Sequence, residues 1–307
     1  MGNRQRAIIN ALAVPLMILG RRGPARGETG ALGKHGRMKH IVLLVHERDP
    51  LEFSYFLYEL ASIWRAEGMR VSVRPGLLPP VEAELAILHV DLTWVPPEYQ
   101  ALCQQYPRVL NATVADISKR TISRHLVTAP DGDWQGPVVV KTDRNYGGVP
   151  ESVRFGNAWS RFRASRRVNY RVYRTPRQVP RRLWSDEDWV VERFLPERSG
   201  SHYCLRTYTF LGDAYTHSRC FANVPIIKSW AVVGREDLGE PPPELVALRR
   251  AMQMEYGKLD YALVDGKVVL YDVNKTPSFG ALAPERARAI VGGLARGVDG
   301  FLASRAA

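Results

Sequence analysis

The chain has few cysteines and lacks an apolar run of membrane-spanning length. Its 307 residues include three cysteines, Cys103, Cys204 and Cys220. Thiols so few and so widely separated exclude a disulfide framework and a zinc knuckle, and they predict a reducing, cytoplasmic setting. No apolar run reaches the roughly 20 residues that a membrane span needs. The length allows about two or three subdomains with cores of their own.

Acidic residues are also fewer than basic ones, and two segments of the chain contain almost no acids. The chain has 43 lysines and arginines against 31 acids, a formal net charge of +12. Residues 1–37 carry seven basic side chains and one acid, and therefore half of that net charge. Residues 161–182 carry nine arginines and no acid. An excess of positive charge points to an anionic partner, but its uneven distribution argues against a whole-protein nucleic-acid surface.

Residues 1–37 differ in composition from the rest of the chain. A basic start and a mostly apolar stretch at residues 7–20 resemble a short signal peptide. Arg21 and Arg22, however, stand where such a peptide would have small residues for cleavage. We expect translation to begin at Met38, so that residues 1–37 are a spurious or disordered extension. A signal or membrane-surface segment is the alternative.

From Met38 to residue 122, predicted strands and helices alternate. Residues 51–67 have the apolar spacing of a helix that ends at Gly68. Strands are predicted at residues 40–45, 70–74, 85–90 and 109–110. This alternation is typical of a parallel sheet covered on both faces. We therefore expect residues 38–122 to form a small α/β subdomain.

The pattern changes to α+β over residues 123–307, which we expect to form a second domain. Strands are predicted at residues 138–141, 189–194, 204–211 and 214–221. Helices are predicted at residues 243–256 and 284–302, on either side of a β-hairpin. The fold class that follows is a combination of α/β and α+β architecture.

That hairpin, at residues 259–274, carries the strongest chemical signal in the chain. An Asp-Gly turn joins its two strands. Asp272 and Asn274 lie two residues apart, so their side chains leave the same face of the second strand. Asp260 lies near the start of the first strand, where pairing can bring it close to them. Two carboxylates and an amide oxygen suit Mg²⁺, which completes its shell with phosphate oxygens and water. The hairpin therefore predicts a nucleotide-phosphate site.

A second candidate begins where a predicted strand ends at Lys141. The loop that follows contains Gly147 and Gly148. A lysine ammonium can neutralise a phosphate, and glycines let backbone N–H groups approach its oxygens. A strand followed by a turn with a surface lysine is an equally simple interpretation. Lys119 is ambiguous in the same way.

Residues 190–197 form a strand broken by a proline, with acids at both ends. It is either an edge strand with solvated charges or a hinge whose backbone binds adenine, with Glu197 accepting hydrogen bonds from ribose. Arg206, on the next strand, is a core-edge charge or a phosphate clamp. We choose Arg219 as a second catalytic cation, because charge on phosphoryl oxygens needs cations placed in advance. Lys228 is another cation that could face the reaction centre.

Taken in this order, these features resemble the ATP-grasp superfamily over residues 39–304. The acid–hairpin–acid-x-Asn pattern is similar to the metal motif of D-alanine–D-alanine ligases, glutathione synthetases and ribosomal-protein glutamate ligases. The resemblance implies an ATP-grasp fold preceded by a small parallel-sheet α/β subdomain. It also implies that the nucleotide lies between two α+β subdomains of the ATP-grasp domain.

The resemblance assigns roles to individual residues. The implied ligands of two Mg²⁺ ions, with Mn²⁺ as an alternative, are Asp260, Asp272 and Asn274. The implied phosphate contacts are Lys119, Lys141, Asn145, Tyr146, Gly147 and Gly148. The implied adenine contacts are Glu192, Arg193, Phe194 and Leu195, and the implied ribose contact is Glu197. The catalytic cations are Arg206 and Lys141, to which we add Arg219.

The sequence departs from the common ATP-grasp pattern at three places. Asp272 stands where glutamate is commoner, and Lys275 stands where many of these ligases have a small residue. The phosphate loop has only two adjacent glycines. These departures leave the metal motif intact but put the chain outside the well-described subfamilies, so they leave the substrate open.

The function implied is that of an ATP- and Mg²⁺-dependent, ADP-forming ligase in the cytoplasm. It would activate a carboxylate as an acyl phosphate for attack by an amine. A kinase that phosphorylates a hydroxyl is one alternative. A non-catalytic module that binds ATP or nucleic acid through residues 161–182 is another. If residues 161–182 do not form such a module, they are either a solvated insertion or a binding site for an acidic substrate or polymer. Nucleic acid is the less favoured ligand of this segment. The sequence does not specify whether the chain forms a homo-oligomer.

Overall fold

The first part of the chain folds into a four-stranded parallel sheet with strand order β2-β1-β3-β4. Its strands are β1 (His40–Val45), β2 (Arg70–Pro75), β3 (Leu85–His89) and β4 (Val109–Leu110). Successive side chains of β1 enter different cores, one with helix α1 (Phe56–Ala66) and one with α2 (Pro97–Cys103). The sheet is thus covered on both faces, which is why β1 is buried along its whole length.

The computed structural model describes residues 38–49, 51, 55–167, 169–280 and 282–303. They all belong to one compact unit, Met38–Ala307. The expectation for residues 1–37 lies outside the described residues, and the proposed division at residue 122 remains a prediction. No helix in the described part of the chain is long and apolar enough to cross a membrane.

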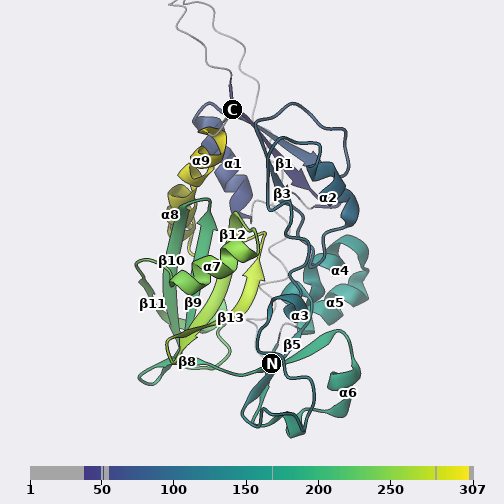
Figure 1. Cartoon of the computed structure of the whole chain (residues 1–307), viewed down its shortest axis with the longest axis vertical. Helices are drawn as coiled ribbons and strands as arrows, with labels where there is room; N and C mark the ends of the chain where they lie inside the picture. The colour runs from purple at the N-terminus through teal and green to yellow at the C-terminus, as the bar shows by residue number, and fades with distance from the viewer. Residues whose placement is uncertain (1–37, 50, 52–54, 168, 281, 304–307) are drawn as a thin grey trace, which may run out of the picture. The chain divides into compact units, whose positions relative to one another are not determined.

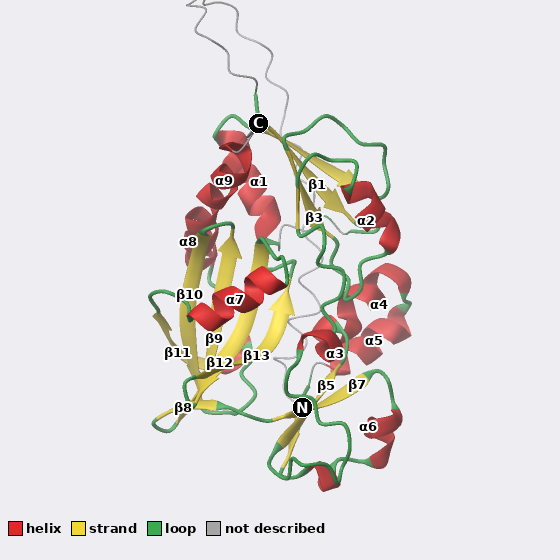
Figure 2. Ribbon diagram, in the orientation of Figure 1, coloured by secondary structure: helices red, strands yellow, loops and turns green. Residues whose placement is uncertain are grey.

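A six-stranded antiparallel sheet follows, with the order β11-β10-β9-β12-β13 and β8 paired to β9 (Figures 1 and 2). Its strands are β8 (Glu197–Ser199), β9 (His202–Leu211), β10 (Ala214–Ala222), β11 (Val232–Asp237), β12 (Tyr256–Val264) and β13 (Lys267–Asn274). Helix α7 (Pro243–Ala251) packs against it through Leu245. Leu211 and Tyr256 of this sheet share a core with β1, α1 and helix α8 (Pro284–Ala295). That shared core joins the parallel and antiparallel sheets.

A third sheet, with the antiparallel order β6-β5-β7, carries the predicted phosphate loop. Its strands are β5 (Val138–Thr142), β6 (Arg171–Tyr173) and β7 (Trp189–Arg193). The 3-10 turn η1 (Asn145–Gly148) follows β5 and leads into helices α4 (Val149–Phe155) and α5 (Ala158–Arg167). Short helices α3 (Lys119–Ile122) and α6 (Arg181–Ser185) complete this region. One parallel and two antiparallel sheets confirm the predicted combination of α/β and α+β architecture.

Three predicted helices are shorter than expected. The helix predicted at residues 51–67 spans Phe56–Ala66, since Tyr55 forms a β-bridge instead. The helix predicted at residues 243–256 ends at Ala251, because Gln253 adopts a left-handed φ of 50° and Tyr256 already begins β12. The helix predicted at residues 284–302 ends at Ala295 and continues as a 3-10 turn, Arg296–Val298, and helix α9 (Asp299–Ala303). The arginine-rich segment is mostly regular structure, since α5, β6 and α6 all lie partly or wholly in it.

Candidate active site

The predicted hairpin forms and places its two acids side by side. β12 and β13 are antiparallel, with Asp260 directly opposite Asp272 and Lys258 opposite Asn274. Asp265 and Gly266 have φ angles of 51° and 75° at the turn, as a two-residue hairpin loop requires. A register irregularity follows Asp260. The three predicted metal ligands therefore occupy one end of the hairpin.

Lysines neutralise both acids. Lys258 Nζ lies 2.7 Å from Asp260 Oδ2, and Lys119 Nζ lies 2.5 Å from Asp272 Oδ1. Helix α3 positions Lys119, whose backbone N–H donates to the carbonyl of Asp143. Burial alone would raise the pKa of Asp272, but the Lys119 ammonium, together with those of Lys258 and Lys141, outweighs burial and lowers it. Asp272 is thus held as a carboxylate with its charge balanced by a buried lysine.

Asn274 has local partners on the same side of the hairpin. Its side-chain oxygen accepts a hydrogen bond from the Thr276 backbone N–H at 2.8 Å. Among the described residues, no group of three or more His, Cys, Asp or Glu side chains could hold a metal alone. An ion at this hairpin would therefore need the Asn274 amide oxygen or ligand oxygens in addition to Asp260 and Asp272. That donor set suits Mg²⁺, which favours one or two carboxylates and completes its shell with phosphate and water.

A pocket with an empty volume of about 860 Å³, partly open to solvent, adjoins the hairpin. Its charged and titratable lining residues are His125, Lys141, Tyr170, Glu192, Arg193, Lys228, Asp260, Tyr271 and Asp272. Phe194 and the aliphatic residues Val139, Val269 and Leu270 also line it. Strands from two sheets thus contribute basic, acidic and apolar side chains to its lining.

The predicted phosphate lysine and hinge strand meet in this pocket. β5 and β7 are paired, and Lys141 Nζ lies 2.6 Å from Glu192 Oε2. Both side chains are buried, so Glu192 is not a solvated edge charge. The Leu195 carbonyl accepts a hydrogen bond from the Tyr271 hydroxyl at 2.6 Å. The hinge segment is therefore tied to the second strand of the hairpin.

Glu197, Arg206 and Arg219 form a separate ion-pair cluster. Glu197 accepts two hydrogen bonds from Arg206 Nε and Nη2 at 2.8 and 2.9 Å, and Arg219 Nη1 lies 3.3 Å from its carboxylate. The Leu263 backbone N–H donates to it as well, at 2.8 Å. Burial would raise the pKa of Glu197, but these donors, Arg206 foremost, lower it. None of the three residues is among those lining the pocket. Their predicted ribose and catalytic roles remain predictions.

The predicted phosphate loop is hydrogen-bonded to Thr93 at its first residue, and its residues are not among those that line the pocket. Tyr146, Gly147 and Gly148 have φ angles of 45°, 71° and 77°. Glycine adopts these angles without strain, which explains two of the three positions. The Asn145 backbone N–H donates to Thr93 Oγ1 at 2.9 Å, and the Tyr146 side chain is 60% exposed. The loop is thus anchored at its start and exposed at its tip.

Several residues that line the pocket were given no role from the sequence. The Tyr170 ring lies between two cations, with Lys228 Nζ 4.2 Å and Lys141 Nζ 6.0 Å from its centre. Burial lowers the pKa of Lys228 and raises that of Tyr170. His125 and Tyr271 also line the pocket. Lys228 had a sequence signal as a cation near Arg219, and Tyr271 lies beside Asp272 in the predicted hairpin, whereas Tyr170 and His125 come from segments whose approach depends on the tertiary fold.

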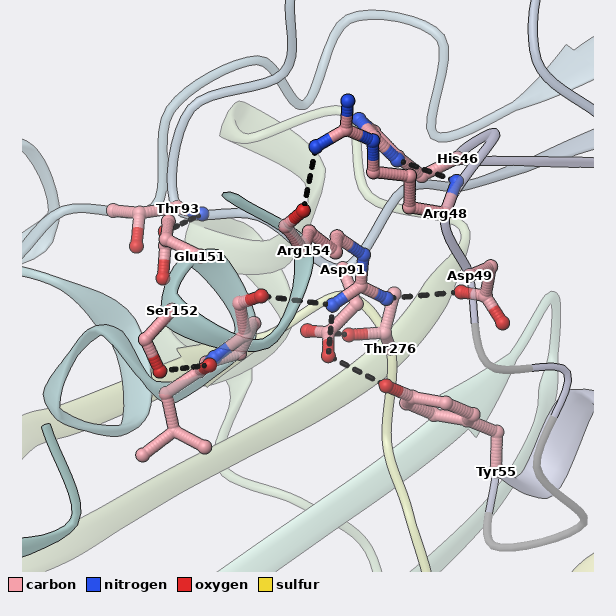
Figure 3. A network of polar contacts seen from close by, with 12 residues as sticks. His46, Arg48, Asp49, Tyr55, Asp91, Thr93, Glu151, Ser152, Arg154 and Thr276 are labelled. Atoms are coloured by element: carbon pink, nitrogen blue, oxygen red, sulfur yellow. Dashed lines mark hydrogen bonds and ion pairs between the residues drawn. The ribbon is translucent and has the colours of Figure 1, made fainter. Parts of the chain in front are cut away.

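A buried polar network fixes helix α4, the element that follows the loop (Figure 3). Arg154 Nη2 lies 2.9 Å from Asp49 Oδ2, and Arg154 Nη1 lies 3.8 Å from Asp91 Oδ2. Asp91 also accepts hydrogen bonds from the Tyr55 and Thr276 hydroxyls, at 2.6 and 2.7 Å. The network joins α4 to the ends of β1 and β3 and to the segment after β13. It thereby positions the loop relative to the metal motif.

No protein-family model and no curated protein sequence matches this chain. Among solved structures, the chain is similar to ATP-grasp ligases, the family that its sequence resembles. A RimK domain ATP-grasp protein from Sphaerobacter thermophilus is 13% identical, with 86% of this chain and 100% of that chain covered and a TM-score of 0.48. The ATP-grasp ligase PsnB, complexed with a minimal precursor, is 13% identical, with 87% and 99% covered and a TM-score of 0.47.

D-alanine–D-alanine ligase from Bacillus anthracis, complexed with ATP, is also 13% identical, with 87% and 96% covered and a TM-score of 0.44. All three TM-scores lie below 0.5. The function of this chain therefore has to be inferred from its own side chains.

Proposed function

We propose that this chain is an ATP-dependent, ADP-forming ligase that joins a carboxylate to an amine. The observation that supports this most is the meeting of Lys141, Asp260 and Asp272 around one pocket. Asp260 and Asp272 face each other across the hairpin, and Lys141 comes from a different sheet. A phosphate site needs this combination of a lysine and metal-binding carboxylates.

The charge balance of the pocket favours a nucleotide that arrives with a metal ion. The lining holds three cations, Lys141, Arg193 and Lys228, against three carboxylates, Glu192, Asp260 and Asp272. These six charges cancel, and Lys119 and Lys258, which pair with Asp272 and Asp260, add two positive charges, too few to neutralise a triphosphate. Mg²⁺, held by Asp260, Asp272 and Asn274, would supply that positive charge.

In the proposed reaction, a carboxylate oxygen of the acceptor attacks the γ-phosphorus of ATP. The bond from that phosphorus to the bridging oxygen breaks, and ADP leaves. The amine nitrogen then attacks the acyl carbon, loses a proton, and inorganic phosphate leaves with the acyl oxygen. Lys141 and Lys228 would stabilise charge on the phosphoryl oxygens, and the pocket walls would exclude water from the acyl phosphate.

Mg²⁺·ATP binding to the full chain tests this proposal directly. At about 100 times its dissociation constant, the ligand should stabilise the fold by roughly 2.7 kcal/mol, measured as a rise in melting temperature. Asp272→Asn and Asn274→Ala should abolish the rise, because the first removes the negative charge of a proposed metal ligand and the second removes the oxygen of another. Asp265→Asn is the matched control, since it removes a carboxylate from the same hairpin and keeps a residue that tolerates its φ of 51°. A rise that persists in Asp272→Asn would contradict the proposed site.

Product analysis distinguishes the reaction types. Release of phosphate that requires both a carboxylate and an amine is the expected result for a ligase. A phosphorylated acceptor without free phosphate would instead identify a kinase. AMP as a product would contradict the acyl-phosphate route. ATP binding without turnover on any acceptor would support the non-catalytic module.

A further inference from the structure

Helix α5 carries an exposed aromatic and basic stripe. Trp159, Phe162, Arg163 and Arg166 are spaced three, four and seven residues apart, so they share one face of the helix. Trp159 is 65% exposed and Phe162 is 49% exposed, whereas Ala164 on the opposite face is buried. The helix therefore packs through its small residue and presents its largest side chains to the surroundings. We call these four residues the α5 stripe.

The positive charge of the α5 stripe is not compensated. Arg163 and Arg166 are exposed and form no ion pair with the described residues. By contrast Arg167, on the inner side of the helix, lies 2.7 Å from Asp188. Exposed apolar rings beside unpaired cations are unusual on a surface that faces only water. This combination fits a partner that brings both carboxylates and apolar side chains.

The arrangement of the rings argues against nucleic acid. The Trp159 and Phe162 rings stack on each other at 5.9 Å, and the Arg166 guanidinium lies 5.3 Å from the Phe162 ring. Phe162 thus already contacts both Trp159 and Arg166 through its ring, whereas base stacking needs an open aromatic face. A second copy of the chain is disfavoured as well, because two such stripes would bring like charges together.

A membrane surface fits less well than a peptide. Helices that lie in a membrane interface separate their apolar face from their charged face. In α5 Arg163 and Arg166 share a face with the two aromatic rings, and Ala164, which is buried, lies away from that face. Glutamate or aspartate side chains with neighbouring leucine-like residues would match both parts of the stripe at once.

The α5 stripe is also connected to the pocket. Tyr170, three residues after the end of α5, contacts Lys141 and Lys228 in the pocket. At its other end, α5 packs against α4, which Arg154 holds to the ends of the parallel strands. A ligand on α5 would therefore lie between the two segments that border the phosphate loop and the pocket.

We propose that the α5 stripe docks an acidic polypeptide, and that this polypeptide supplies the carboxylate that the enzyme activates. The docking stands on the geometry and charge of α5 alone. The identification of the peptide as the acceptor rests on the proposed ligase function.

The test is a fluorescence-anisotropy titration of the full chain, without ATP, with a labelled peptide of Glu and Leu residues. The reference peptide has Gln in place of every Glu. Arg163→Gln combined with Arg166→Gln should weaken binding of the acidic peptide about tenfold. Arg250→Gln combined with Arg288→Gln is the matched control. It removes the same charge from exposed positions on α7 and α8 and should leave the affinity unchanged.

Three results would overturn the docking site. The first is equal affinity for the Glu and Gln peptides, and the second is an equal loss of affinity for the Glu peptide in the two double variants. The third is binding of a single-stranded oligonucleotide or of phosphatidylserine vesicles that is tighter than binding of the Glu peptide. Because this titration omits ATP, its failure would leave the Mg²⁺·ATP melting shift intact, whereas failure of the nucleotide site would leave peptide binding intact.

With both sites established, phosphate release stimulated by the Glu peptide and reduced in Arg163→Gln/Arg166→Gln supports the acceptor role. Stimulation that is equal in that variant and in wild type would refute it.

Discussion

At the scale of single residues, Arg154 has the most demanding environment. Its side chain is buried with Asp49 and Asp91, and both acids hold further hydroxyl donors, Tyr58 on Asp49 and Tyr55 on Asp91. A buried ion pair contributes little net stability, because desolvation offsets attraction, but removal of one partner leaves the other charge unpaired. The consequence is that Arg154 is hard to replace even though it touches no proposed substrate.

We therefore expect Arg154→Leu to lower the free energy of unfolding by roughly 3–5 kcal/mol, as measured by urea denaturation. Arg177→Leu, at an exposed position, should change it by no more than about 0.5 kcal/mol. Adding Asp49→Asn to Arg154→Leu should restore part of the loss, since it removes one of the unpaired charges. Equal effects of Arg154→Leu and Arg177→Leu would show that the network carries no such charge penalty.

At the scale of elements, the end of α8 shows how one glycine sets a boundary. A Cβ built on Gly297 would lie 1.8 Å from the backbone oxygen of Leu211, at the end of β9. The chain can therefore approach the β9–β10 turn only without a side chain here, and α8 gives way to a 3-10 turn at this contact. A Cβ added to Gly292, inside the same helix, would meet no described atom within 4 Å apart from the helix's own backbone and the adjoining residues.

The two glycines should respond to the same substitution with opposite signs. Gly297→Ala should destabilise the protein by about 1–3 kcal/mol or more, because backbone atoms must move to make room. Gly292→Ala should stabilise it by about 0.5–1 kcal/mol, because alanine is the better helix former. Thermal unfolding of both variants is the measurement. A neutral Gly297→Ala would show that the α8–α9 connection does not pack this closely against β9.

At the scale of the whole molecule, the free energy of unfolding should decrease as the pH is lowered, at pH values well above those at which the carboxylates titrate. Burial lowers the pKa of His89 from 6.5 to about 4, and neither ring nitrogen has a hydrogen-bond partner among the described residues. Burial also lowers the pKa of His46, His125 and His217. Between these folded values and 6.5, the unfolded chain binds protons that the folded chain does not. Falling pH therefore favours unfolding.

For His89 alone, the loss between pH 7 and pH 5 should be about 2 kcal/mol of unfolding free energy. His89→Phe keeps a ring of similar size in the contact with Tyr55 and removes the titrating group. Its stability should therefore depend less steeply on pH than that of wild type in urea titrations across this range. Identical slopes would mean that His89 gains its proton without unfolding.

Much of the local structure could be predicted from the sequence, because it depends on neighbours in the chain. Apolar runs predicted β1 to β4, and the Asp-Gly turn predicted the hairpin, but a register shift after Asp260, which the turn does not specify, places Asp260 opposite Asp272. Helix ends were predicted less well. The ends near Gln253 and Gly297 depend on a left-handed residue and on a contact with Leu211, which no periodicity reveals.

The sequence by itself determined the sheet types and the hairpin that carries the candidate metal ligands, because periodicity and turn chemistry act over a few residues. Only the tertiary structure decided which charges meet. It placed Lys119 on Asp272, 153 residues away, and brought Tyr170 between Lys141 and Lys228. It also directed Arg206 and Arg219 to Glu197. Such pairings follow from the packing of whole sheets and helices, which a pattern along one segment does not encode.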